Sequence, residues 1–249
     1  MRSTKTMSSI DYLTPDWDAP ASVHAVSTTR HGGVSKGAWQ GLNLALHVED
    51  DSADVAVNRQ VLRNALNLPA EPYWLTQVHG NLVLDASRAS DCVADAAFSS
   101  HPGDVCAVMT ADCLPVLFCN RTGDKVAAAH AGWRGLAAGV LEASLAKFSP
   151  GDEVLAWLGP AIGPAAFEVG NDVRATFVQD QADAESAFVE NRPGHWLADI
   201  YVLARLRLQR AGVDTITGGN FCTYSDPDRF YSFRRDKITG RMASLIWIQ

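Results

Sequence analysis

Three short apolar runs follow one another in the middle of the chain, at 104–110, 116–120 and 125–129. Each run is bounded by residues that favour turns, which is the pattern of buried β-strands. A chain with such closely spaced strands is restricted to folds that contain a sheet. Cys113 lies between the first and second runs, and His130 directly follows the third. Pairing of these strands could therefore bring a thiol and an imidazole close together.

The rest of the chain mixes strand and helix patterns without strict β–α–β alternation, which predicts an α+β fold with helices covering mixed sheets. Apolar periodicity and helix-ending signals predict helices at 55–67, 136–148, 169–178 and 199–209. Alternating or continuous apolar runs predict further strands at 23–29 and 154–158. The chain is expected to end in a hairpin formed by 230–235 and 242–248, and the second strand is apolar enough to lie inside a sheet.

The length of 249 residues favours one domain, and a hydrophobic content of 47% is sufficient for a full core. No internal repeat, low-complexity tract or linker divides the sequence. We therefore expect a flexible N-terminus at 1–9, followed by a single catalytic domain at 10–249.

Charge and composition exclude several classes of protein. The net charge of −7 disfavours a nucleic-acid-binding surface, which normally carries a basic field. No run of about eighteen apolar residues is present, so no membrane span is predicted, and the N-terminus lacks the apolar region of a secretory signal. The five cysteines are odd in number and show no C-x-x-C spacing. A reducing, cytoplasmic location is expected.

His79 ends another apolar stretch and is followed by Gly80. Together His79, Cys113 and His130 supply the ligand set of a catalytic zinc site, which uses three protein ligands and leaves one position open. Their separations of 34 and 17 positions match no zinc-finger or zinc-ribbon spacing. Spacing alone therefore leaves a second interpretation open, in which Cys113 is a small buried apolar residue and both histidines are structural.

The same atoms could also act without a metal. Cys113 would be the nucleophile and His130 its base, with Asp112 orienting the imidazole. Backbone amides near Gly132 or Gly135 could stabilise the developing anion. A multicopper oxidase mechanism is not encoded, because it needs about ten imidazoles and this chain has seven histidines with no His-x-His pair.

Three blocks of sequence stand out: Thr-Gln-Val-His-Gly at 76–80, Met-Thr-Ala-Asp-Cys-Leu-Pro-Val at 109–116 and Ala-His-Ala-Gly-Trp-Arg-Gly at 129–135. These blocks resemble the signature blocks of the YfiH family, whose members are often labelled laccase-domain proteins or polyphenol oxidases and include FAMIN. Further matching blocks lie at 27–35, 158–164, 234–236 and 240–244, so the resemblance covers nearly the whole chain.

The resemblance implies a layered α/β/β/α sandwich that binds Zn²⁺ through His79, Cys113 and His130, with copper only as an adventitious occupant. It implies an enzyme acting on purine nucleosides and phosphate, by phosphorolysis of adenosine, inosine, guanosine and methylthioadenosine and by deamination of adenosine. The alternative is a thiol- or zinc-dependent amidase that edits peptidoglycan precursors. Catalysis is expected from Asp112, Cys113 and His130. The sequence predicts no particular oligomeric state.

Four polar residues in the matching blocks are candidates for substrate binding. Arg30 lies close to the Gly32-Gly33 pair and could bind a phosphate or ribose. A guanidinium can donate two parallel hydrogen bonds to an oxyanion, and glycines allow backbone amides to approach the same anion. A surface arginine in a turn fits the same pattern. Asn43, His47 and Gln77 are expected to line the pocket. Asp112 is expected to orient a ligand histidine or to transfer protons.

Overall fold

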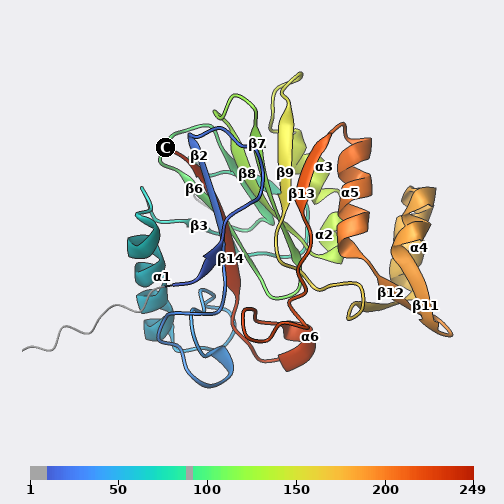
Figure 1. The fold of residues 1–249 in the computed structure, drawn as a ribbon, viewed down its shortest axis with the longest axis horizontal. Helices are drawn as coiled ribbons and strands as arrows, with labels where there is room; N and C mark the ends of the chain where they lie inside the picture. Colours follow the sequence, from blue (N-terminus) through green and yellow to red (C-terminus); the bar gives the residue numbers. More distant parts are fainter. Residues whose placement is uncertain (1–9, 88–91) are drawn as a thin grey trace, which may run out of the picture.

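Two β-sheets pack face to face in the computed structural model, which describes residues 10–87 and 92–249. The expected flexible N-terminus at 1–9 lies outside the described residues. The first sheet has five strands, in the spatial order β1 (Tyr12–Leu13), β2 (Val23–Thr28), β14 (Met242–Ile248), β6 (Val105–Thr110) and β3 (Tyr73–Trp74). Figure 1 shows this sheet edge-on, with the first and last long strands of the chain side by side.

The second sheet has six strands, in the order β13 (Thr215–Gly218), β9 (Val154–Leu158), β7 (Leu114–Asn120), β8 (Val126–Ala131), β5 (Ala96–Ser99) and β4 (Val83–Asp85). Its inner strands pair antiparallel, whereas β13 with β9 and β4 with β5 pair parallel. The chain passes from the first sheet to the second between β6 and β7. The turn that carries Cys113 therefore lies where the two sheets meet.

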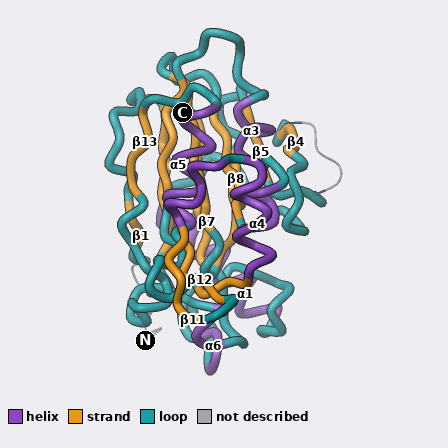
Figure 2. The backbone as a smooth tube through the Cα atoms, turned by 90° about the vertical axis from the view of Figure 1, so that its right-hand side faces the viewer, coloured by secondary structure: helices purple, strands orange, loops and turns teal. Residues whose placement is uncertain are grey.

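Helices cover the outer face of each sheet (Figures 1 and 2). Helix α1 (Ser52–Leu66) lies against the first sheet; it begins where the Asp51 carboxylate accepts the amide of Ala53, and it ends at Asn67 in the left-handed conformation. The second sheet is covered by α2 (Trp133–Ala137), α3 (Val140–Leu145) and α5 (Ile200–Arg210). A small third sheet and helix lie beyond them: β10 (Glu168–Gly170), α4 (Asn171–Asp180), β11 (Phe188–Arg192) and β12 (His195–Ala198). The remaining helices are short: the 3₁₀ turns Gly37–Trp39 and Ala182–Ala187, and α6 (Phe233–Asp236).

Three apolar cores hold these layers together. Leu117 and Ile246 belong to the core between the two sheets. Leu62 of α1 and Leu245 belong to the core on the outer face of the first sheet, and Leu203 of α5 belongs to the core on the outer face of the second. Consecutive residues of β14 thus enter different cores, because side chains alternate along a strand. These cores confirm the layered α/β/β/α sandwich in a single domain.

The C-terminal hairpin prediction is wrong. Strand β14 pairs antiparallel with β2 and β6, as expected for a strand inside a sheet. The segment 230–235, however, contributes the start of helix α6, where the Ser232 hydroxyl accepts the amide of Arg235 as an N-cap. Local apolar content suggested a strand, but tertiary contacts around residues 230–236 determine the structure there.

The predicted helix at 136–148 is also wrong as a single element. It is divided into α2 and α3, because Gly139 adopts the left-handed conformation with φ of +88°. The predicted helix at 169–178 begins at Asn171 as α4, after strand β10. Within 10–87 and 92–249, no helix has both the length and the apolar character needed to cross a membrane.

Candidate metal centre

His79, Cys113 and His130 come together from three separate connections of the fold. His79 lies in the loop that follows β3, Cys113 immediately precedes β7, and His130 lies near the end of β8. One potential ligand atom from each of the three lies within 4.8 Å of the others. The Cys113 Sγ and His79 Nε2 atoms are 3.8 Å apart. The two imidazole rings have centroids 4.8 Å apart and meet at 76°, in an edge-to-face arrangement.

The buried carboxylate of Asp95 organises the two histidines. Asp95 Oδ1 lies 2.8 Å from Nδ1 of His130, whose side chain is almost fully buried. The same carboxylate accepts the backbone amides of Val78, His79 and Gly80 at 3.1, 2.9 and 2.7 Å. His79 has a φ of +62°, which is uncommon for a residue with a side chain. The hydrogen bonds to Asp95 therefore hold both the loop and the ring orientation in place.

The electrostatics of this group favour a thiolate. Burial raises the pKa of the Cys113 thiol, but the imidazoles of His130 and His79 lower the pKa by more, so the net shift is downward. Burial lowers the pKa of His130, but Cys113 and Asp95 raise it by more. For Asp95, burial raises the pKa and the hydrogen bonds from His130 and Gly80 lower it to below its usual value. Thiolate is the form that attacks electrophiles and binds metals.

The residues present fit a metal ion. Two imidazole nitrogens and one thiolate are a donor set suited to zinc and other borderline transition metals. A carboxylate on the far nitrogen of a ligating histidine is a recurrent support of such centres, because it fixes the tautomer and raises ligand basicity. Among the described residues these three side chains form the one group of this kind, so the structure offers a single candidate centre.

Gly132 leaves the space that the three donors need. A Cβ atom at this position would lie 2.8 Å from Cδ2 of His79 and 3.0 Å from Sγ of Cys113, closer than packed atoms approach. We expect Gly132→Ala to displace both donors and to weaken metal affinity by about 10-fold or more, measured by competition with a chromogenic chelator. The control is Gly80→Ala, whose added methyl would meet nothing closer than 3.6 Å. Equal metal affinity in the two variants would contradict this role of Gly132.

Cys113 lines two cavities. The His47 cavity has a volume of about 300 Å³, and its lining includes His47, Gln77, His79, Cys113, His130, Phe233 and Arg241. The Lys237 cavity has a volume of about 290 Å³, and its lining includes Asp112, Cys113, Arg134, Phe233, Arg234 and Lys237. Cys113 and Phe233 line both cavities. A ligand in either cavity would therefore lie beside the thiol.

Two of the expected substrate-binding residues, His47 and Gln77, line the His47 cavity. Burial and the positive charge of Arg241 lower the pKa of His47, which keeps its imidazole neutral at neutral pH. The Gln77 amide bonds to the backbone of Met109 in both directions, at 2.8 Å each, so it also fixes the wall of the cavity to β6.

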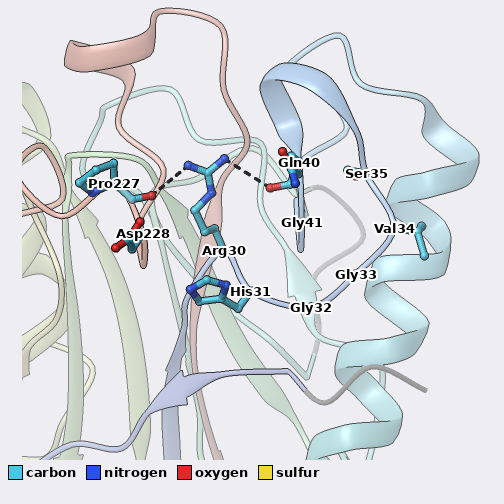
Figure 3. A pocket seen from close by; sticks show the side chains of 10 residues that line it. All are labelled: Arg30, His31, Gly32, Gly33, Val34, Ser35, Gln40, Gly41, Pro227 and Asp228. Carbon is cyan, nitrogen blue, oxygen red and sulfur yellow. Dashed lines mark hydrogen bonds between the residues drawn. The ribbon is translucent and has the colours of Figure 1, made fainter. Parts of the chain in front are cut away.

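The other two expected substrate-binding residues lie elsewhere. Arg30 lines a separate cavity of about 580 Å³ between 30–41 and 227–228, where its guanidinium donates to the carbonyls of Pro227 and Gln40 (Figure 3). Asn43 is fully buried, and its side chain bonds to Ala45, Asp50 and the amide of Arg241. The structure therefore gives Asn43 a scaffolding role and places Arg30 outside the two cavities beside Cys113.

The expectation that Asp112 orients a histidine is corrected to Asp95. The carboxylate of Asp112 accepts the Thr223 hydroxyl at 2.7 Å and the Arg234 amide at 2.6 Å. With φ of +97°, Asp112 holds the sharp turn that presents Cys113.

Sequence reasoning missed Asp95 and Arg241. Asp95 is a lone carboxylate among the apolar residues of 93–97, and a buried charge of this kind signals an unseen partner. Arg241 lies in a block that resembles the family, but nothing in its local pattern indicates that it lines the same cavity as His79 and Cys113.

Comparison with known proteins supports a common origin over the whole chain. Purine nucleoside phosphorylase PA4543 of Pseudomonas aeruginosa is 57% identical over 240 residues, covering 96% of this chain and 98% of that protein. Purine nucleoside phosphorylase YfiH of Escherichia coli is 54% identical over 239 residues, covering 95% and 98%. The crystal structure of NMB0706 from Neisseria meningitidis is 50% identical, covers 96% of this chain and 99% of that chain, and superposes with a TM-score of 0.92.

A family model described as multi-copper polyphenol oxidoreductase laccase matches residues 24–249. The match therefore includes both cavities and the three donor residues. Together with the relatives above, it confirms the resemblance seen in the signature blocks: the chain belongs to the YfiH family of laccase-domain proteins.

Proposed function

We propose that this protein is a zinc-dependent purine nucleoside phosphorylase that acts on adenosine, inosine, guanosine and methylthioadenosine and also deaminates adenosine. The observation that carries the proposal is the group of His79, Cys113 and His130 in the wall of the His47 cavity, with Cys113 shared by the Lys237 cavity, so that there is room for a nucleoside and a second reactant. The names of the relatives from Pseudomonas aeruginosa and Escherichia coli support the same reaction class.

The reaction needs two partners in contact. In phosphorolysis an oxygen of hydrogen phosphate bonds to C1′ of the ribose, while the bond from C1′ to the purine nitrogen breaks. The electrons of that bond remain on the purine, which takes up the proton of the phosphate, and ribose 1-phosphate is the second product. In deamination a water oxygen bonds to C6 of adenosine and the amino group leaves as ammonia, giving inosine.

Zn²⁺ bound by His79, Cys113 and His130 would supply a Lewis acid and a water of lowered pKa for the deamination. The protein's own residues would position the metal ligands and the substrate. Asp95 keeps the His130 ring fixed through Nδ1. The side chain of Phe233, half exposed between the two cavities, offers an aromatic face on which a purine could stack. Arg241, whose guanidinium is held by the carbonyls of Thr239 and Gly240, contributes a fixed positive charge to the His47 cavity.

A thiol-dependent amidase is the second candidate, and the interaction of Cys113 with His130 favours it. The lowered pKa of Cys113 beside His130, whose ring is oriented by Asp95, forms a nucleophile, a base and an orienting carboxylate without any metal. In this alternative the substrate would be the amide bond of a peptidoglycan precursor. The Cys113 thiolate would bond to the amide carbon while the C–N bond breaks, the amine would leave with a proton from His130, and water would then hydrolyse the thioester.

The deciding experiment incubates the zinc-loaded protein with adenosine, with and without inorganic phosphate, and separates the products by chromatography. We expect adenine and ribose 1-phosphate only when phosphate is present, and inosine in both cases. Metal-free protein should lose both activities. A metal-free wild type that instead cleaves a precursor amide, and that loses this activity both on labelling of Cys113 by a thiol reagent and in Cys113→Ser, would establish the amidase and overturn the phosphorylase.

A further inference from the structure

Three cationic side chains line the Lys237 cavity: Arg134, Arg234 and Lys237. Asp112 is the only acidic residue in the lining, so the lining carries more positive than negative charge. The Asp112 carboxylate already accepts hydrogen bonds from the Thr223 hydroxyl and the Arg234 amide. The positive charge of the cavity is therefore not neutralised by its own wall.

These cations retain free donors. Within the described parts of the chain, the side chains of Arg134 and Lys237 form no hydrogen bond or ion pair, and each lies near an aromatic ring. Arg134 lies 4.4 Å from the ring centroid of Trp133, and Lys237 lies 5.7 Å from that of Phe233. Arg234 donates from Nη1 to the Glu168 carbonyl, which leaves its other guanidinium donors available.

Two other cations of the protein, Arg207 and Arg235, are satisfied by their own surroundings. Arg207 pairs with Glu142 and Asp180, and the Arg235 guanidinium donates to three backbone carbonyls and to Asp236. In the His47 cavity, the guanidinium of Arg241 is held by the carbonyls of Thr239 and Gly240. The Lys237 cavity thus differs from the His47 cavity in having several cations with donors to spare.

We propose that the Lys237 cavity is the phosphate subsite, in which Arg134, Arg234 and Lys237 bind the oxyanion beside Cys113. This inference rests on the proposed phosphorolysis, because that reaction requires an inorganic phosphate next to the bound nucleoside. The apolar walls formed by Ile162, Phe167 and Ile200 lower the local dielectric and strengthen the attraction between cation and phosphate. The nucleoside, which is neutral, then occupies the His47 cavity, where Arg241 is the one arginine or lysine in the lining.

The test uses Lys237→Gln and Arg134→Gln in the zinc-loaded protein. Because a hydrogen bond to a charged group is lost in each, we expect the Kd of inorganic phosphate, measured by calorimetry, to rise about 10-fold or more. The KM for phosphate in phosphorolysis should rise in parallel. The KM for the nucleoside should stay within about 2-fold of the wild-type value, because neither substitution removes a contact with the nucleoside. The control is Lys147→Gln, which removes a lysine that also faces an aromatic ring, Phe98, but lies outside both cavities.

The outcomes separate this subsite from the proposed function. If the wild type binds phosphate, the two variants bind it weakly and no nucleoside is cleaved, the subsite stands and the phosphorylase fails. If nucleosides are cleaved but phosphate affinity is unchanged in both variants, the subsite is wrong. A rise in the KM for the nucleoside instead of phosphate would place the purine in the Lys237 cavity and overturn the assignment. Loss of phosphate binding on removal of the metal, with no effect of either variant, would also overturn it.

Discussion

Cys113→Ser is expected to abolish metal binding and phosphorolysis together. The substitution replaces a soft thiolate by a hydroxyl that stays protonated at neutral pH, so the centre retains only the imidazoles of His79 and His130. Substitution of a residue that hydrogen-bonds to a metal ligand typically lowers metal affinity by 10- to 100-fold. Loss of a ligand itself should lower metal affinity by about 100-fold or more. Metal content after purification, measured by mass spectrometry, should fall from about one equivalent per chain, the single ion that a three-ligand site holds, to near zero.

The control for this change is Cys222→Ser. Cys222 is also half-buried, and although burial raises its pKa, hydrogen bonds from Ser225 and the backbone lower the pKa to below the usual value, so it is a second thiol of similar character. It contacts Gly163 and Ser225 and lines neither cavity beside Cys113. Metal content and activity should be unchanged in this variant. A Cys113→Ser protein that keeps a full equivalent of metal would show that the three side chains do not form the centre.

Asp95→Asn is expected to have the second-largest effect, although Asp95 is not one of the three potential ligands. Oδ1 of Asp95 accepts from His130 Nδ1 and the His79 amide, and Oδ2 accepts from the Val78 and Gly80 amides. An asparagine has one oxygen, so its NH₂ group must face two N–H donors in either orientation. We expect metal affinity to fall by about 10- to 100-fold and the free energy of unfolding of metal-free protein to fall by about 1–3 kcal/mol.

Chelator competition and chemical denaturation measure these two effects, with Asp124→Asn as the control. Asp124 also accepts several hydrogen bonds, but it lies in the turn at the opposite end of β7 from Cys113. The lowered pKa of Asp95 means that its stabilising contribution is present at neutral pH and is lost as the pH falls through the lowered value, below 3.8. The wild type and Asp95→Asn should therefore converge in stability in strong acid. Unchanged metal affinity in Asp95→Asn would contradict the orienting role.

Local pattern was sufficient for much of the fold. The apolar runs predicted strands where β6, β7, β8 and β9 lie, because continuous burial on both faces leaves a signal that needs no knowledge of the partner strand. The segment at 230–235 shows the limit of that reasoning. Aromatic and apolar residues there favour a strand, yet Ser232 caps a helix and Phe233 points between two cavities, and these contacts arise only in the folded chain.

Residue chemistry suggested the three donors, because a thiol and two imidazoles next to strand ends are recognisable one at a time, and the family resemblance indicated the same three residues. It also suggested Arg30, whose Gly-Gly neighbours suit an anion, but its guanidinium folds against Pro227 and Gln40 in a separate cavity. Only long-range strand pairing could identify Asp95. Ala96 pairs with Ala129 across β5 and β8, and this register alone sets Asp95 beside His130, 35 positions away. The sequence by itself indicated which atoms can bind a metal. The tertiary structure decided which carboxylate supports those atoms and which cations surround them, because these contacts join segments that are far apart in the sequence and leave no local pattern.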